Sequence, residues 1–184
     1  MPRRVHDDGD ADHGVNLNRG FTAVVAALDG FEADGPGAVL VKTGTTLISK
    51  VGGASGPLYG SAFRAIGKAI DGPEADPVVF GAALRDGLAA IRKLGAAAPG
   101  DKTIVDALDP AVEAFEAAAV GGLKAAAEAA ADAAEAGAKA TAELQARKGR
   151  ASYLGARSVG HQDPGATSTA LILRALADTV SGGV

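Results

Sequence analysis

The chain has 184 residues, a length that suits one domain, because domains usually contain roughly 100 to 200 residues. Its formal net charge of −4 gives no reason to expect nucleic acid or a membrane surface as a partner. The absence of cysteine excludes disulfides, thiolate catalysis and zinc–thiolate sites. No apolar run could span a bilayer and no secretory signal follows Arg3 and Arg4, so we expect a cytoplasmic protein.

Apolar residues recur at intervals of three and four, and no alternating pattern typical of a strand is found. This periodicity predicts about seven helices, the fourth of them beginning at Asp76 as N-cap with Pro77 in its first turn. Short connections between long helices favour an antiparallel up-and-down bundle. The predicted apolar stripes lie within residues 21–28, 40–51, 59–70, 80–94, 104–115, 123–144 and 172–180.

Residues 123–149 are rich enough in alanine to resemble low-complexity sequence. Their spaced charges, and the basic residues Arg147 and Lys148 before Gly149, instead predict one long helix with a face of small residues.

The acidic stretch "DDGDADHG" at residues 7–14 is a candidate metal site. Its glycines allow a tight turn, and Asp10 and Asp12 can direct two carboxylates at one point. Such hard oxygen ligands suit Mg²⁺, which often binds substrate phosphates as well, whereas the spacing of a calcium-binding EF-hand is absent. The alternative is a solvated acidic terminus.

The glycine-rich stretch "VGGASGPLYG" at residues 51–60 is a candidate phosphate site. Its glycines allow main-chain N–H groups to approach an anion, Ser55 offers a hydroxyl, and a helix is expected to begin near Pro57. It matches neither of the familiar nucleotide fingerprints, GxxxxGK[ST] and GxGxxG. The alternative is an ordinary turn between two helices.

Two further loops carry polar residues. The long loop of residues 147–168 contains Arg157, His161 and Asp163, and long loops in compact helical domains are often functional. Asp163 could instead be only the cap of the last helix, and Arg157 could brace its own loop. In "APGDKTIVD", residues 98–106, Asp101 is the expected N-cap and Lys102 is expected to be exposed.

An antiparallel bundle can gather these loops at one end, which would place carboxylates, a glycine turn and basic residues around one mouth. The chemistry they share is the binding of a magnesium–nucleotide complex.

The sequence resembles the DhaL subunit family of dihydroxyacetone kinase, through four stretches that occur in the family's order and cover nearly the whole chain. The fourth is long enough to be highly specific. They are "GDADHGVNLNRGF" (9–21), "GGASGPLYG" (52–60), "PGDKT" (99–103) and "QARKGRASYLGARSVGHQDPGATS" (145–168).

The resemblance implies an antiparallel barrel of eight helices with ADP or ATP bound at one end. It implies Mg²⁺ ligands at Asp10 and Asp12, phosphates beside the glycine turn, and a nucleoside surrounded by the loops near residues 100 and 157–165. The implied nucleotide-binding residues are His13, Gly14, Val15, Asn16, Ala54, Ser55, Gly100, Arg157, Asp163, Pro164 and Gly165.

One departure from the family pattern concerns the metal site. The family has a third metal aspartate five residues before the position of Asp10, and here that residue is Val5. We therefore expect one ADP-binding domain over residues 1–184 that is shortened at its N-terminus and lacks the family's first helix, with apolar surface exposed beside it. Asp7 or Asp8 could substitute as the missing ligand.

The activity that the resemblance implies is phosphoryl transfer to dihydroxyacetone, or glycerone, in glycerol metabolism. In the phosphotransferase-system version, bound ADP is rephosphorylated by DhaM and passes the phosphoryl group to substrate held on DhaK. No covalent protein nucleophile is expected, and neither His13 nor His161 is assigned that role. The alternatives are the nucleotide domain of an ATP-dependent kinase and a non-catalytic ADP-binding subunit.

Overall fold

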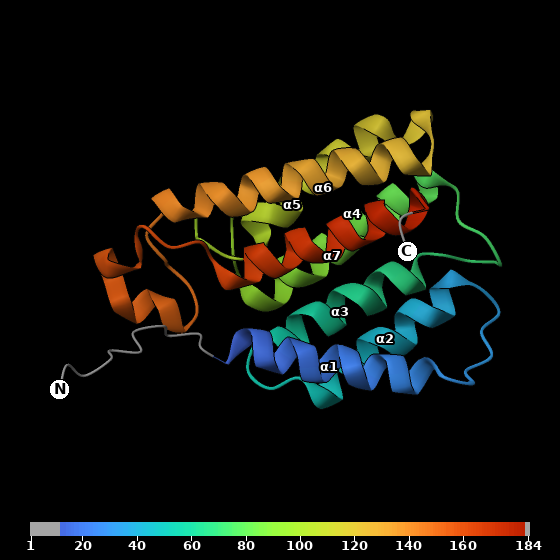
Figure 1. Ribbon diagram of the computed structural model, residues 1–184, viewed down its shortest axis with the longest axis horizontal. Helices are drawn as coiled ribbons and strands as arrows, with labels where there is room; N and C mark the ends of the chain where they lie inside the picture. The colour runs from blue at the N-terminus through green and yellow to red at the C-terminus, as the bar shows by residue number, and fades with distance from the viewer. Residues whose placement is uncertain (1–11, 183–184) are drawn as a thin grey trace.

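The computed structural model describes residues 12–182, which are helical and contain no strand (Figure 1). The all-helical prediction is therefore confirmed for the described part of the chain, with seven α-helices where about seven were expected. Three short 3₁₀ helices join them. The elements are α1 (His13–Leu28), α2 (Pro36–Lys50), α3 (Ser55–Lys68), α4 (Pro77–Gly95), α5 (Ile104–Ala118), η1 (Ala119–Gly121), α6 (Leu123–Ala140), η2 (Thr141–Glu143), η3 (Arg150–Ser158) and α7 (Pro164–Val180).

The helices form an antiparallel bundle in which most neighbours in sequence are neighbours in space. Each helix from α1 to α5 packs against the next, α6 packs between α5 and α7, and α7 also contacts α5 and α1. Because the connections are short, successive helices run in opposite directions, and the first turns of α1, α3, α5 and α7 lie at one end. In Figure 1 this is the end that carries η3.

The core depends on small side chains as much as on large ones. Phe115 of α5 and Leu47 of α2 are fully buried, whereas the buried face of α6 consists of alanines. At Gly137 an added Cβ atom would lie 2.3 Å from the carbonyl oxygen of Asp106, so α5 and α6 approach more closely than any larger residue would permit. The fully buried alanines of α6 are Ala126, Ala127, Ala130, Ala131 and Ala134.

The predicted long helix over residues 123–149 is wrong at its C-terminal end, because α6 stops at Ala140. Thr141 is completely buried, and its hydroxyl donates to the Ala138 carbonyl at 2.6 Å. The same oxygen accepts from the Asp163 amide at 2.8 Å. Helix propensity alone would allow α6 to continue, but this contact with the start of α7 fixes where the chain leaves the helix.

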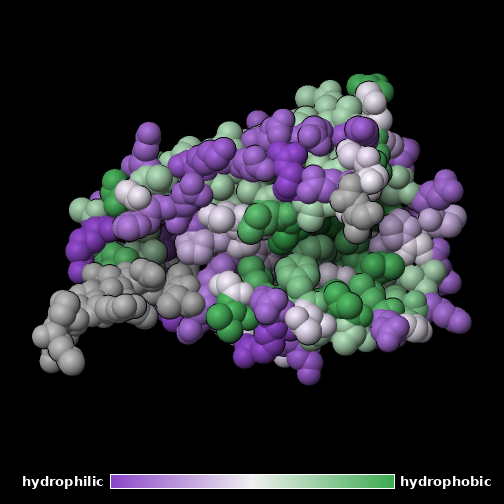
Figure 2. Space-filling model, viewed as in Figure 1, coloured by the Kyte–Doolittle hydropathy of each residue, from purple (hydrophilic) through white to green (hydrophobic). Residues whose placement is uncertain are grey.

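An apolar face lies across α1 and α7. Val15 and Val25 on α1 and Leu171 on α7 are largely exposed, and Figure 2 shows apolar side chains gathered over this face of the molecule. Within residues 12–182, no helix combines the length and hydrophobicity needed to cross a membrane.

Candidate functional site

A pocket of about 350 Å³ opens at the end of the bundle where the odd-numbered helices begin. Most of its lining comes from stretches that the sequence singled out, which are far apart along the chain, and the end of α4 contributes the rest. These stretches are the start of α1, the glycine turn before α3, the turn before α5, residues 148–151 around the start of η3, and the first turn of α7.

The ends of the helices give this pocket its electrostatic character. The helices α1, α3, α5 and α7 begin at His13, Ser55, Ile104 and Pro164, and residues in or beside all four first turns line the pocket. The N-terminus of a helix carries a partial positive charge and N–H groups without partners inside the helix. Four such ends around one pocket favour an anionic ligand.

The glycine turn lies directly before α3. Gly53 has a φ of +69°, a left-handed conformation that glycine adopts without strain. The helix begins at Ser55, two residues earlier than the expected start near Pro57. Its N-cap residue, Ala54, has no polar side chain to satisfy the first amides, so these N–H groups remain available beside the pocket.

His13 connects three helices at the floor of the site. It is buried, with Nε2 2.5 Å from Ser168 Oγ and Nδ1 3.1 Å from Ser55 Oγ. Because Ser168 donates its own hydroxyl proton to the Pro164 carbonyl, its oxygen accepts from Nε2 of His13. The other ring nitrogen, Nδ1, shares a hydrogen bond with the Ser55 hydroxyl and so holds that side chain in place.

Asp163 caps α7 and also faces the pocket. Its carboxylate accepts from the Ala166 amide at 2.7 Å, so the expected cap is present, although the side chain is buried. Next to it, the Tyr59 hydroxyl donates to the Gly165 carbonyl at 2.8 Å. Burial raises the pKa of Tyr59 to about 12, which keeps this hydroxyl protonated.

Not all of the sequence-predicted nucleotide residues line the pocket. His13, Asn16, Ala54, Ser55, Asp163 and Gly165 do. The other predicted residues do not contribute to its lining, and Val15 belongs to the exposed face of α1. These other residues are Gly14, Val15, Gly100, Arg157 and Pro164.

Lys102 lies in surroundings that differ from the prediction. Expected to be exposed, it is 4 % exposed, and its ammonium donates to three main-chain carbonyls. Burial lowers its pKa, and the negative charge of Asp163 opposes that shift. The backbone of Lys102 is in the left-handed region, with a φ of 63°, which is unusual for a residue other than glycine.

The N-cap of α5 also differs from the expectation. Thr103, not Asp101, caps the helix, and its hydroxyl accepts from the Val105 amide at 3.1 Å. Asp106 completes a capping box by accepting from the Thr103 amide at 2.7 Å. Asp101 instead accepts from the Ala98 amide within the preceding turn. The Thr-x-x-Asp spacing was the signal that could have identified this cap.

Comparison with known proteins identifies the family of the chain. The DAK2 domain family matches residues 8–178. The chain belongs to the DAK2 domain family. It is 46% identical over 172 residues to the PEP-dependent dihydroxyacetone kinase ADP-binding subunit DhaL of Escherichia coli K12, covering 92% of this chain and 82% of that relative. A DhaL subunit of Listeria innocua is 41% identical over 171 residues, covering 93% and 82%.

The fold of this DAK2 domain also resembles a solved structure. The dihydroxyacetone kinase of C. freundii matches with a TM-score of 0.70 and 27% identity over 92% of this chain, which spans 29% of that longer chain. A second structure of the same kinase, in complex with AMP-PNP and Mg²⁺, matches with a TM-score of 0.68.

The acidic residues of the DAK2 domain are described only in part. Asp10, Asp7 and Asp8 lie outside the described residues, and within residues 12–182 no three His, Asp or Glu side chains form a metal cluster. Asp12 is exposed at the N-cap of α1, and its side chain makes no capping hydrogen bond. Its carboxylate is therefore free of capping and chemically suited to a hard cation such as Mg²⁺.

Proposed function

We propose that this DAK2 domain is the nucleotide-binding phosphotransferase subunit of a dihydroxyacetone kinase, a single domain over residues 1–184 that uses ADP or ATP. The observation that supports this most directly is the meeting of four helix N-termini and the glycine turn at one pocket. The DhaL relatives, named as ADP-binding subunits, support the same assignment.

Within this proposal the phosphates lie at the glycine turn. The amides at the start of α3 and the Ser55 hydroxyl would hold them, with Ser55 oriented by His13. The nucleoside would lie toward the turn before α5 and the loop that ends at Asp163. Phosphoryl transfer needs little covalent help from protein, so fixed donors that hold the phosphates in line supply much of the catalysis.

Asp12, together with Asp10, would hold Mg²⁺ beside the phosphates. When bound, the cation neutralises charge on the phosphate oxygens during transfer. Asp12 suits this role because it stands at the same helix end as His13 and is not used in capping.

The proposed partners are DhaM, which would rephosphorylate the bound ADP, and DhaK, which would hold dihydroxyacetone. The proposed location is the cytoplasm, where these partners would meet. The similar kinase of C. freundii is solved in complex with AMP-PNP. ATP is therefore the second phosphoryl donor to be tested.

Calorimetric titration with ADP and Mg²⁺ tests nucleotide binding. We expect Asp12→Ala and Asp10→Ala each to weaken Mg–ADP binding by about tenfold or more, while metal-free ADP binding changes little. Asp76→Ala, which removes an exposed carboxylate at the opposite end of the bundle, is the control and should bind as the wild type does.

Mixing the purified chain with DhaK, dihydroxyacetone and either DhaM charged from phosphoenolpyruvate or ATP tests transfer. Product formation that Asp12→Ala abolishes supports the phosphotransferase, and the donor that works identifies the version. Tight ADP binding without product from either donor would overturn the proposed activity and leave a non-catalytic ADP-binding subunit.

A further inference from the structure

The ammonium of Lys102 occupies the centre of the loop that follows α6. It donates to the carbonyl oxygens of Leu144 at 3.0 Å, Ser158 at 2.5 Å and His161 at 2.7 Å. An ammonium group has three N–H bonds, and all three are used here. Lys102 therefore has no donor left for a phosphate, although it lines the pocket.

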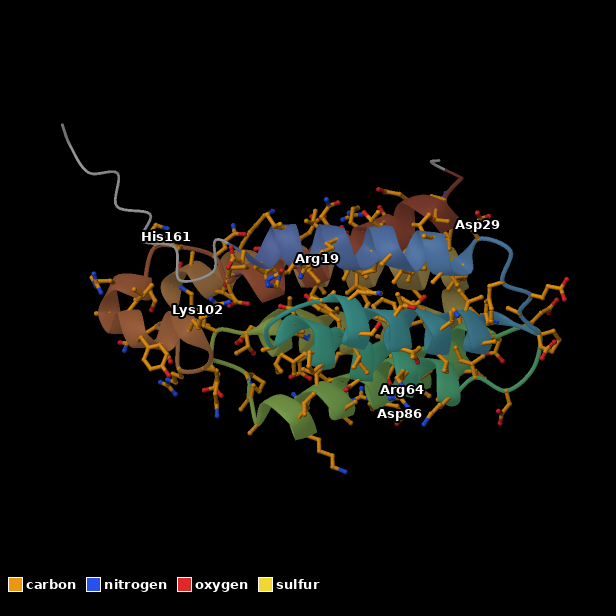
Figure 3. All side chains as sticks on the ribbon, turned by 90° about the horizontal axis from the view of Figure 1, so that it is seen from below. Arg19, Asp29, Arg64, Asp86, Lys102 and His161 are labelled. Atoms are coloured by element: carbon orange, nitrogen blue, oxygen red, sulfur yellow. The ribbon has the colours of Figure 1, made fainter. Side chains whose placement is uncertain are left out.

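The loop that Lys102 holds is also tied to itself, since the Ala146 amide donates to the Ser158 hydroxyl at 2.9 Å and that hydroxyl donates to the Gly155 carbonyl at 2.6 Å. Its two ends are fixed, since the Arg147 amide donates to the Asp101 carbonyl at 3.1 Å and the Gly160 amide donates to the Ala142 carbonyl at 2.8 Å. Between them, η3 makes few contacts with the α-helices of residues 12–182. Figure 3 shows Lys102 beside this loop, with His161 at the same end of the molecule.

The same loop forms one wall of the pocket. Residues 148–151 line it, and the Arg150 guanidinium lies across from the glycine turn, 3.9 Å from where a Cβ atom of Gly53 would be. A change in the position of η3 would therefore open the pocket on the side opposite α3.

We propose that Lys102 is a positioning residue, which holds the loop of residues 144–161 closed as the wall of the pocket and does not itself bind the ligand. The left-handed backbone at this position carries the side chain inward, where the three carbonyls replace water around its charge. The significance of this wall for nucleotide binding depends on the function proposed above, whereas the closing of the loop does not.

Limited trypsin digestion without nucleotide tests the closing of the loop. Lys102→Met removes the ammonium but keeps a side chain of similar length, so we expect cleavage after Lys148, Arg150 and Arg157 to become about tenfold faster, because proteolysis follows the population of the opened segment. Lys93→Met, at an exposed lysine of α4, is the matched control and should leave the rate unchanged. Equal rates in wild type and Lys102→Met would overturn the proposal.

Binding of adenosine, AMP and ADP to the same variants separates positioning from phosphate contact. A wall that is closed for a smaller fraction of the time weakens every ligand by one common factor, here about tenfold. A loss confined to AMP and ADP would show that Lys102 contacts phosphate and would overturn the proposal. If no ligand binds the wild type, the proposed function fails, while the digestion still tests the loop.

Lys102→Arg and Lys102→Gln provide further checks. Arginine keeps charge and donors, so it should restore slow cleavage at least in part, whereas glutamine, with two N–H donors, should give an intermediate rate. If Lys102→Met does not fold, as judged by circular dichroism, Lys102→Gln takes its place in the digestion, and a wild-type rate in that variant would overturn the proposal.

Discussion

Two helices of the bundle begin with the same dipeptide but in opposite surroundings. Asp76 and Pro77 start α4, where the Asp76 carboxylate is exposed and accepts from the Val78 and Val79 amides. Asp163 and Pro164 start α7, where the carboxylate is buried beside Lys102 and lines the pocket. The local sequence fixes the cap in both cases, and only the tertiary surroundings make one of them part of a site.

The two helix starts should differ most in the free energy of unfolding that is lost when each carboxylate is removed. We expect Asp163→Ala to lower the free energy of unfolding by at least about 2 kcal/mol, because it removes the cap and also a negative charge beside the buried Lys102 ammonium. Urea denaturation measures this. Asp163→Asn keeps a capping oxygen, so its free energy of unfolding should fall by less. If Asp163→Ala lost no more than Asp76→Ala, the comparison would fail and Asp163 would be only a cap.

Exchanging the residue after each proline sharpens the comparison. Gly165→Val gives α7 the start of α4, but its Cβ atom would lie 2.8 Å from Ile104 Cγ1 and 3.0 Å from Asp163 Oδ2. We expect this overpacking to lower the free energy of unfolding by about 1–3 kcal/mol. The reverse change, Val78→Gly, affects a residue that is 62% exposed and should cost about 0.5 kcal/mol through helix propensity. Thermal denaturation of both variants measures the two losses of stability. Equal losses would contradict the expected difference between the two helix starts.

The pH dependence of stability at Tyr59 tests the surroundings of the buried start of α7. Tyr59→Phe should lower stability at pH 7 by about 1 kcal/mol, because the Gly165 carbonyl loses one of its donors. The pKa of about 12 in the folded chain exceeds the ordinary tyrosine value of 10.0, so the folded state keeps its proton to higher pH. The free energy of unfolding is therefore unaffected by this group below pH 10, and it falls by about 1.4 kcal/mol per pH unit as the pH rises from 10 toward 12. Parallel pH–stability curves for wild type and variant would contradict this.

A small and local effect is expected at the exposed cap of α4. Asp76→Ala should cost about 1 kcal/mol, the usual value for a lost N-cap, and should leave ADP affinity unchanged because α4 begins at the far end of the bundle. Chemical denaturation and calorimetry on one preparation measure both quantities. A clear change in ADP affinity would show that the two ends of the bundle are coupled.

These two helix starts also show how far the sequence could predict the molecule. Periodicity and capping residues located the helices, and Asp76 was assigned correctly because its bonds reach only two and three residues ahead. The exposure expected for Lys102 was wrong because its three carbonyl partners lie 42, 56 and 59 residues away. The early end of α6 depends in the same way on a bond from Thr141 to Asp163.

The candidate site was predictable in its parts but not in its connections. The glycine turn and the loop before α7 could be recognised from local residue types, and both line the pocket. The link from His13 to Ser55 and Ser168 joins residues 42 and 155 positions apart, and no local pattern encodes it. Local sequence therefore identified the segments of the site, and packing decided which side chains meet.

The alanine face of α6 has a consequence for the response of this fold to temperature. The heat-capacity change on unfolding grows with the apolar area that becomes exposed, and an alanine side chain exposes little. With aromatic residues at only 4% of the chain, this core should give a heat-capacity change below the usual value of about 12–15 cal/mol/K per residue. The stability curve is then flatter, so the bundle keeps a similar free energy of unfolding over a wide range of temperatures.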